Sequence, residues 1–177
     1  LPFKNKGMTP VDLNMGLWSN VADLSAPEQL VREQRGESLD VPLPPDRRMM
    51  PRGQYAPLSG MNLAFTRRAM PFMYFPPMGE CQPYGRFDDI WCGLVAQKVM
   101  AHLGWDWTCG EPFVRHQRAS DTLANLAKEA PGILANEKYW EVIDGVTLTA
   151  STAVLAVREI AEALIKAEGP GSYLTKW

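Results

Sequence analysis

Residues 85–104 read GRFDDIWCGLVAQKVMAHLG, and this stretch determines the fold class. Asp88 can cap a helix, because its carboxylate can accept hydrogen bonds from the free N–H groups of a first turn. The apolar positions that follow have helical spacing: Ile90, Trp91, Leu94, Val95 and Val99. Gly104 is a typical helix end after Leu103. The stretch therefore predicts a helix over residues 88–103.

Short strands are predicted on both sides of this helix. Residues 61–65 alternate, with Met61, Leu63 and Phe65 pointing one way. Residues 105–116 carry aromatic and apolar positions around Gly110 and Pro112, which suggests two short strands. Strands that alternate with helices favour an α/β or α+β domain, and we expect an α/β fold with a mixed sheet flanked by helices.

The remaining segments divide into a proline-rich first half and a helical second half. Proline blocks helix interiors and central strands, so residues 42–54 are predicted to form a surface loop. Ser120 can cap a helix over residues 121–130 that stops before Pro131-Gly132. A last helix is predicted from about Thr152 to Glu168. One of its faces would carry Val154, Val157, Ala161, Leu164 and Ile165.

Composition limits the possible functions. A length of 177 residues suits one domain, and residues 134–177 are predicted to be a helical C-terminal extension of it. A formal net charge of −2 gives no reason to expect nucleic acid or anionic lipid as a partner. We expect no membrane span, since no apolar run approaches the ~18 residues that one needs. Three cysteines without a CxxC spacing favour free thiols in a reducing, cytoplasmic compartment.

Gly60, Met61 and Asn62 form the first candidate binding segment, at the start of the predicted strand. Glycine allows a ligand to approach the backbone, and Asn62 offers a donor and acceptors to hydroxyl groups. We expect this strand to be central and its start to border the main pocket. The alternative is a β-bulge with a surface asparagine.

Asp88 and Asp89 form the second candidate site, where the helix dipole favours the charged carboxylates. One of them could act as a base or accept a sugar hydroxyl, and Arg86 could bind phosphate or orient a carboxylate. The alternative is that Asp88 only caps the helix and that Asp89 is a favourable first-turn charge.

His116 and Arg118 form the third, after the second predicted strand. An imidazole there could bind a divalent metal, and Arg118 could reach a diphosphate on the same rim as the acidic pair. The alternative is a hydrogen-bonded structural histidine. His102, inside the predicted helix, is interpreted as structural.

Longer stretches resemble the reversibly glycosylated polypeptide family, whose plant members include UDP-arabinopyranose mutases. The matching stretches are LPF at residues 1–3, GLW at 16–18, APEQLV at 26–31, GMNLAF at 60–65, MYF at 73–75, MGECQPYGRFDDIWCG at 78–93, HLG at 102–104 and RHQRAS at 115–120. They run in register from Leu1 to about Ile133, and no clear match is seen beyond it.

The resemblance implies a partial A-type glycosyltransferase fold, which is Rossmann-like, with a UDP-sugar substrate and Mn²⁺ or Mg²⁺. Plant members interconvert the pyranose and furanose forms of UDP-arabinose and glycosylate themselves. By position, Asp88-Asp89 match the family's acidic pair, His116 its late histidine and Arg118 a lysine. A family arginine aligns with Lys6, which keeps the charge but loses the bidentate fork.

The same resemblance implies that the chain is the C-terminal part of a longer protein, with most metal ligands outside it. We therefore expect a UDP-sugar mutase or transferase whose C-terminal part alone binds UDP-sugar weakly, shows no turnover, and forms a homo-oligomer or pairs with an N-terminal portion. The alternative is an inactive member that serves as an assembly or regulatory subunit. Peripheral association with the Golgi is a further expectation for a eukaryote.

Overall fold

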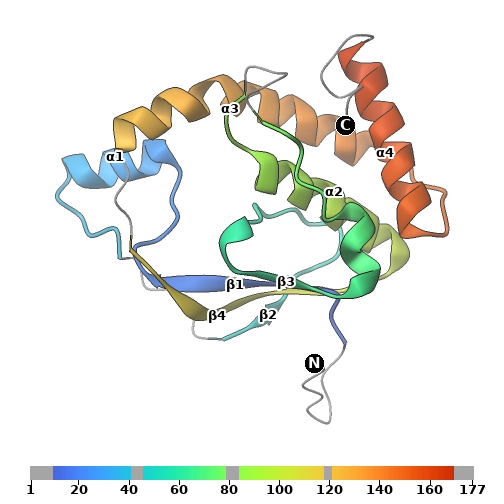
Figure 1. Cartoon of the computed structure of the whole chain (residues 1–177), viewed down its shortest axis with the longest axis horizontal. Helices are drawn as coiled ribbons and strands as arrows, with labels where there is room; N and C mark the ends of the chain where they lie inside the picture. The colour runs from blue at the N-terminus through green and yellow to red at the C-terminus, as the bar shows by residue number, and fades with distance from the viewer. Residues whose placement is uncertain (1–9, 41–45, 79–83, 118–120, 170–177) are drawn as a thin grey trace.

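The computed structural model describes residues 10–40, 46–78, 84–117 and 121–169, which form a four-stranded mixed sheet with the α-helices on one side of it (Figure 1). The strand order is β2-β4-β1-β3. β1 (Leu13–Asn20) and β4 (Trp107–His116) lie parallel at the centre. β3 (Leu63–Phe65) pairs antiparallel with β1, and β2 (Arg48–Met49) pairs antiparallel with β4. The predicted α/β class with a mixed sheet flanked by helices is confirmed.

The central strand β1 was not predicted from the sequence. Leu13, Met15 and Trp18 are buried, but Gly16 and Asn14 interrupt an otherwise apolar pattern. Asn14 is tolerated there because its Oδ1 accepts a hydrogen bond from Thr108 Oγ1 on β4 at 2.7 Å. A polar pair across two central strands thus obscures the pattern of a core strand.

Residues 105–116 form one strand instead of the predicted two. β4 is continuous from Trp107 to His116, although Gly110 has φ +134. The irregularity is absorbed by a register shift against β1 between Gly16 and Trp18, so pairing resumes beyond it.

The prediction of a central strand over residues 60–65 is wrong. Gly60–Asn62 form a short 3₁₀ helix, η1, and only Leu63–Phe65 are extended, at one edge of the sheet. Two contacts explain the turn: the Ser59 hydroxyl accepts from Met61 N, and Asn62 Nδ2 donates to Leu17 O at 2.9 Å. The predicted loop over residues 42–54 likewise contains β2, while 41–45 lie outside the described residues.

Helix α2 (Asp88–Leu103) has the predicted bounds and is the most buried helix of the described part of the chain. Gly104 ends it with φ +70, a left-handed conformation that favours glycine. One detail differs: Phe87 is the N-cap residue, and Asp88 is the first residue of the helix. Asp88 therefore does not cap the helix as predicted.

Helix α3 (Thr122–Gly145) contradicts the prediction of a helix that stops before Pro131. Its N-cap is Asp121, whose carboxylate accepts from Ala124 N at 3.0 Å, and Ser120 lies outside the described residues. A proline in a helix interior costs about 3 kcal/mol. Tyr139 and Ile143 are buried beyond the proline, and each buried side chain of this size contributes about 1.5–3 kcal/mol. Packing therefore outweighs the local signal.

The other helices complete the layer above the sheet (Figure 1). α1 (Ala26–Gln34) follows β1 and packs on α3, and η2 (Arg67–Phe72) contacts α2 and α4. α4 (Ala153–Glu168) has the predicted extent, but its buried face is Ala153, Ala156, Ile160 and Leu164, and Val154 is 57% exposed. Residue 134, the predicted start of the C-terminal extension, lies inside α3.

The core surrounds α2, between the sheet on one side and helices α3 and α4 on the other. Trp91 stacks on Tyr139 of α3, with ring centroids 4.5 Å apart and planes 13° apart, and its Nε1 donates to Asn136 Oδ1 at 3.1 Å. Cys92 and Cys109 are free thiols, and Cys81 lies outside the described residues. None of the described helices has the length and apolar character that would let it cross a bilayer.

Candidate active site

A cavity of about 680 Å³ opens where the end of β1, the start of α1, residues 57–59, the start of α2 and the middle of α3 meet. Apolar and aromatic side chains make up much of its wall. The lining residues are Met15, Trp18, Asp23, Leu24, Ser25, Pro27, Pro57, Leu58, Ser59, Arg86, Phe87, Asp88, Asp89, Ile90, Glu129 and Ile133. Apolar walls with a few convergent polar groups are typical of a small-molecule site.

Asp88 and Asp89 both line this cavity, as predicted, at the first two positions of α2. Asp89 accepts two backbone hydrogen bonds: Oδ2 from Gly60 N at 2.9 Å and Oδ1 from Ile90 N at 2.8 Å. Burial raises the pKa of Asp89, and the negative charges of Asp88 and Asp23 raise it further, while the bond from Gly60 opposes the shift. A raised pKa makes a carboxylate a better proton acceptor, which is a property of residues that transfer protons in active sites.

Asp23 is a third carboxylate at the cavity that sequence reasoning missed. It follows the end of β1 by three residues, and its Oδ2 accepts from Ser59 Oγ at 3.3 Å. The signal for it was the end of a parallel central strand, where ligands of α/β proteins often bind. Because β1 itself was not predicted, that signal could not be used.

Arg86 also lines the cavity, but its guanidinium is already paired. Nη1 lies 3.3 Å from Glu129 Oε1, and Nη2 donates to Asn125 Oδ1 at 2.8 Å. The other carboxylate oxygen of Glu129 accepts from Ala26 N at 3.0 Å. Arg86 and Glu129 therefore tie the segment before α2, the start of α1 and α3 together.

The charge balance of the cavity is acidic. Of the described residues that line it, four are carboxylates and Arg86 is the one cation: the acids are Asp23, Asp88, Asp89 and Glu129. Carboxylate oxygens accept hydrogen bonds from hydroxyl groups, whereas they repel phosphate oxygens. The arrangement fits the hydroxyl-rich part of a ligand better than an anionic part.

Gly60, Met61 and Asn62 do not line the cavity, although the neighbouring Ser59 does. Gly60 contributes the backbone N–H that binds Asp89. The Asn62 side chain is half-buried and lies across Gly16 of β1, where a Cβ atom would be 2.3 Å from Nδ2. The structure thus gives Asn62 a role in attaching η1 to β1.

His116 ends β4 and is not among the residues that line the cavity. Its Nδ1 lies 3.0 Å from Val21 O. A carbonyl can only accept, so Nδ1 carries the proton and the lone pair is left on Nε2, as in many metal-binding histidines. Lys6 and Arg118 lie outside the described residues.

The predicted Mn²⁺ or Mg²⁺ finds no complete set of ligands in the part of the chain that is described. There, no group of three or more His, Cys, Asp or Glu side chains comes close enough to hold an ion. These hard cations prefer several oxygen ligands. His116 by itself does not provide the set of oxygen ligands that such an ion needs.

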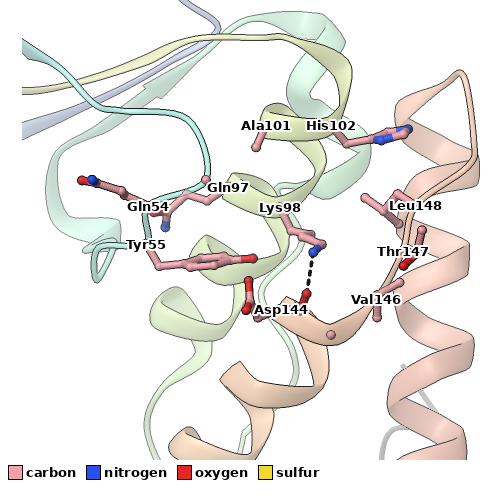
Figure 2. Close-up of a pocket in the computed structure, with 12 residues that line it drawn as sticks. Gln54, Tyr55, Gln97, Lys98, Ala101, His102, Asp144, Val146, Thr147 and Leu148 are labelled. Carbon is pink, nitrogen blue, oxygen red and sulfur yellow. Dashed lines mark hydrogen bonds between the residues drawn. The ribbon is translucent and has the colours of Figure 1, made fainter.

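A second cavity of about 380 Å³ lies at the opposite end of α2 (Figure 2). Its polar groups already serve to join elements: Lys98 Nζ donates to Asp144 O at 2.7 Å, and His102 Nε2 lies 2.7 Å from Ala150 O. Burial, together with the Asp144 carboxylate, raises the pKa of Tyr55. We therefore regard the cavity at the start of α2 as the candidate active site.

The family model of the reversibly glycosylated polypeptides matches residues 1–170. The chain belongs to the reversibly glycosylated polypeptide family. Its match extends well past Ile133, so the resemblance covers α3 and α4 as well as the acidic pair.

Plant proteins to which this chain is similar are named as UDP-arabinopyranose mutases. The chain is 38% identical over 151 residues to a probable UDP-arabinopyranose mutase 1 of Pisum sativum, which covers 84% of this chain and 40% of the relative. It is 37% identical over 150 residues to UDP-arabinopyranose mutase 3 of Arabidopsis thaliana, and this match covers 83% of this chain and 40% of the relative. The chain thus spans about two fifths of the length of these relatives and matches their C-terminal portion.

Proposed function

We propose that this chain supplies the sugar-binding part of a UDP-sugar mutase of the UDP-arabinopyranose type. The observation that supports this proposal is the acidic pair Asp88-Asp89, which lines a cavity in a chain that belongs to the reversibly glycosylated polypeptide family. Relatives named UDP-arabinopyranose mutase match most of the chain. The substrate would be a UDP-sugar, with the sugar in the cavity.

The proposed reaction needs proton transfer and no net change in composition. A pyranose and a furanose differ in which hydroxyl oxygen closes the ring on the anomeric carbon. One ring C–O bond must break and another form, the released oxygen gains a proton, and the closing hydroxyl loses one. Asp89 would carry this proton, because it lines the cavity and burial raises its pKa, which favours uptake of a proton. Asp88 and Asp23 would accept hydrogen bonds from the remaining hydroxyl groups.

The diphosphate would lie outside the acidic cavity. Arg118 and Lys6 are the proposed contacts, with Arg86 at the boundary, where its ion pair with Glu129 leaves other N–H groups available. Mn²⁺ or Mg²⁺ is proposed to be held mainly by residues of the longer protein, with His116 Nε2 as one further ligand.

We also propose that the chain by itself binds UDP-sugar weakly, lacks turnover and self-associates. Supporting observations are the edge position of β3, whose Phe65 is 44% exposed, and the exposure of Met70 at 60%. Uncovered strand edges and apolar surface favour association. A cytoplasmic location, with peripheral association at the Golgi, remains a prediction.

Calorimetric titration tests the sugar-binding role. UDP-arabinopyranose should bind more tightly than UDP, because only the former places hydroxyl groups at the acidic pair, and Asp89→Asn should remove most of the difference. Equal affinity for UDP and UDP-arabinopyranose in the wild-type protein would contradict the proposal.

A further inference from the structure

Phe87, the N-cap residue of α2, has a backbone conformation that is unusual for its residue type. Its φ is +92 and its ψ is 3, a left-handed conformation that bulky residues rarely adopt. Its side chain makes no capping hydrogen bond. Such a conformation persists only where surrounding contacts hold it. Phe87 immediately precedes Asp88 and Asp89 and lines the same cavity.

The ring of Phe87 lies directly against Gly132 of α3. A Cβ atom at Gly132 would lie 2.3 Å from Phe87 Cε2 and 2.5 Å from Cδ2, so any residue except glycine would displace the ring. The ring also packs against Trp91, with centroids 6.1 Å apart. Glycine disfavours a helix interior, and this contact gives a physical reason for its presence in the middle of α3.

The position of the ring bears directly on the acidic pair. The bond from Gly60 N to Asp89 Oδ2, at 2.9 Å, requires the start of α2 to stay next to η1. Hydrogen bonds of this kind weaken steeply once the donor and acceptor separate beyond normal distance. A displacement of residue 87 would therefore move the Asp89 carboxylate away from Gly60.

We propose that Phe87 and Gly132 are positioning residues for the acidic pair. Their contact fixes the backbone at residue 87, and this fixes where the Asp88 and Asp89 carboxylates lie in the cavity. The inference rests on the proposed function only in assuming that these carboxylates bind the sugar. The positioning itself can be measured without any turnover.

The experiment follows the Gly60 amide by NMR in Gly132→Ala, with Gly145→Ala as the matched control. Gly145 lies in the same helix, and a Cβ there would meet nothing within 4 Å. In Gly132→Ala we expect the Gly60 amide proton to move upfield and to exchange about tenfold faster relative to core amides, as loss of one charged hydrogen bond implies. In the Gly145→Ala control, neither the chemical shift nor the exchange rate of the Gly60 amide proton should change. Adding Phe87→Leu to Gly132→Ala should restore part of the signal, because the smaller side chain clears the new methyl group.

An unchanged Gly60 amide in folded Gly132→Ala would overturn the proposal. If that variant does not fold, Phe87→Gly decides, because glycine adopts φ +92 without strain but lacks the ring. Loss of the Gly60 signal in Phe87→Gly supports the proposal, and its retention overturns it. The proposed function fails separately: a lost Gly60 signal with unchanged affinity for UDP-arabinopyranose would support positioning by Phe87 and contradict the role of Asp89 in sugar binding.

Discussion

Asp89 Oδ2 accepts a hydrogen bond from the Gly60 backbone N–H at 2.9 Å, and this bond joins the start of α2 to the turn that leads into β3. Residues 60 and 89 belong to different quoted family stretches, GMNLAF and MGECQPYGRFDDIWCG. The structure connects the two stretches through one carboxylate, which burial and neighbouring charges hold at a raised pKa.

The stability of the protein should depend on pH through Asp89. Because the pKa of Asp89 in the folded state lies above its ordinary value of 3.8, the folded state binds more protons than the unfolded state between the two values. The free energy of unfolding should therefore fall as pH rises from about 3.8 through the folded pKa, and then level off. Asp89→Asn should lack this contribution. Urea denaturation at a series of pH values measures it, and parallel curves for the two proteins would show that the prediction is wrong.

Arg86 should matter more for stability than an arginine on an exposed helix. Arg86→Ala removes the ion pair with Glu129 and the hydrogen bond to Asn125, and we expect a loss of about 1–2 kcal/mol, discounted for the partial exposure of the guanidinium. Arg35, at the end of α1, is more exposed and lies 3.8 Å from Glu37, and Arg35→Ala should cost less than about 0.5 kcal/mol. Urea denaturation compares the two. Equal losses would mean that Arg86 does not tie the helices together.

Gly16 and Asn62 should be energetically coupled. Gly16→Ala places a methyl group 2.3 Å from Asn62 Nδ2, and overpacking of this kind costs about 1–3 kcal/mol. Asn62→Ala removes the bond to Leu17 O, at a cost of about 1–2 kcal/mol. The double variant should lose clearly less than the sum, because the clash disappears. If the stability losses of the two single variants simply add in the double variant, Gly16 and Asn62 are not coupled and the prediction is wrong.

The predicted metal site can be tested by NMR, from the residues whose signals Mn²⁺ broadens. With UDP present, the paramagnetic ion should broaden the ring signals of His116, whose Nε2 is free to bind because Nδ1 faces Val21 O. Binding should be weak, since the described residues offer no group of three ligands. Broadening centred on Asp23, Asp88 and Asp89, with His116 unaffected, would assign the ion to the cavity instead.

The sequence predicted those elements whose local signals agree with their packing. Helix α2 was predicted with correct bounds because its apolar spacing and Gly104 point to the same structure. Helix α3 was cut short because Pro131 and Gly132 are usual helix breakers, yet Gly132 is needed there by the ring of Phe87. That contact joins residues far apart in the sequence and leaves no local pattern.

The candidate site was predicted only in part, because some of its residues follow a local sequence signal and others depend on pairing between distant segments. Asp88 and Asp89 could be identified because a helix start has a recognisable sequence. Asp23 could not, because it depends on β1, whose Asn14 pairs with Thr108 across the sheet. Asn62 was predicted to bind a ligand, whereas in the structure its side-chain amide donates a hydrogen bond to Leu17 O on β1.

The most direct measurement is an NMR titration of the protein with UDP-arabinopyranose that records which backbone amides shift. If the sugar binds beside the acidic pair, the amides of Gly60 and Ile90, which donate to Asp89, should shift and saturate together. In Asp89→Asn the affinity should fall by about tenfold, as loss of a charged hydrogen bond predicts. Shifts confined to the second cavity, around Lys98 and Asp144, or an unchanged affinity in Asp89→Asn, would contradict the account.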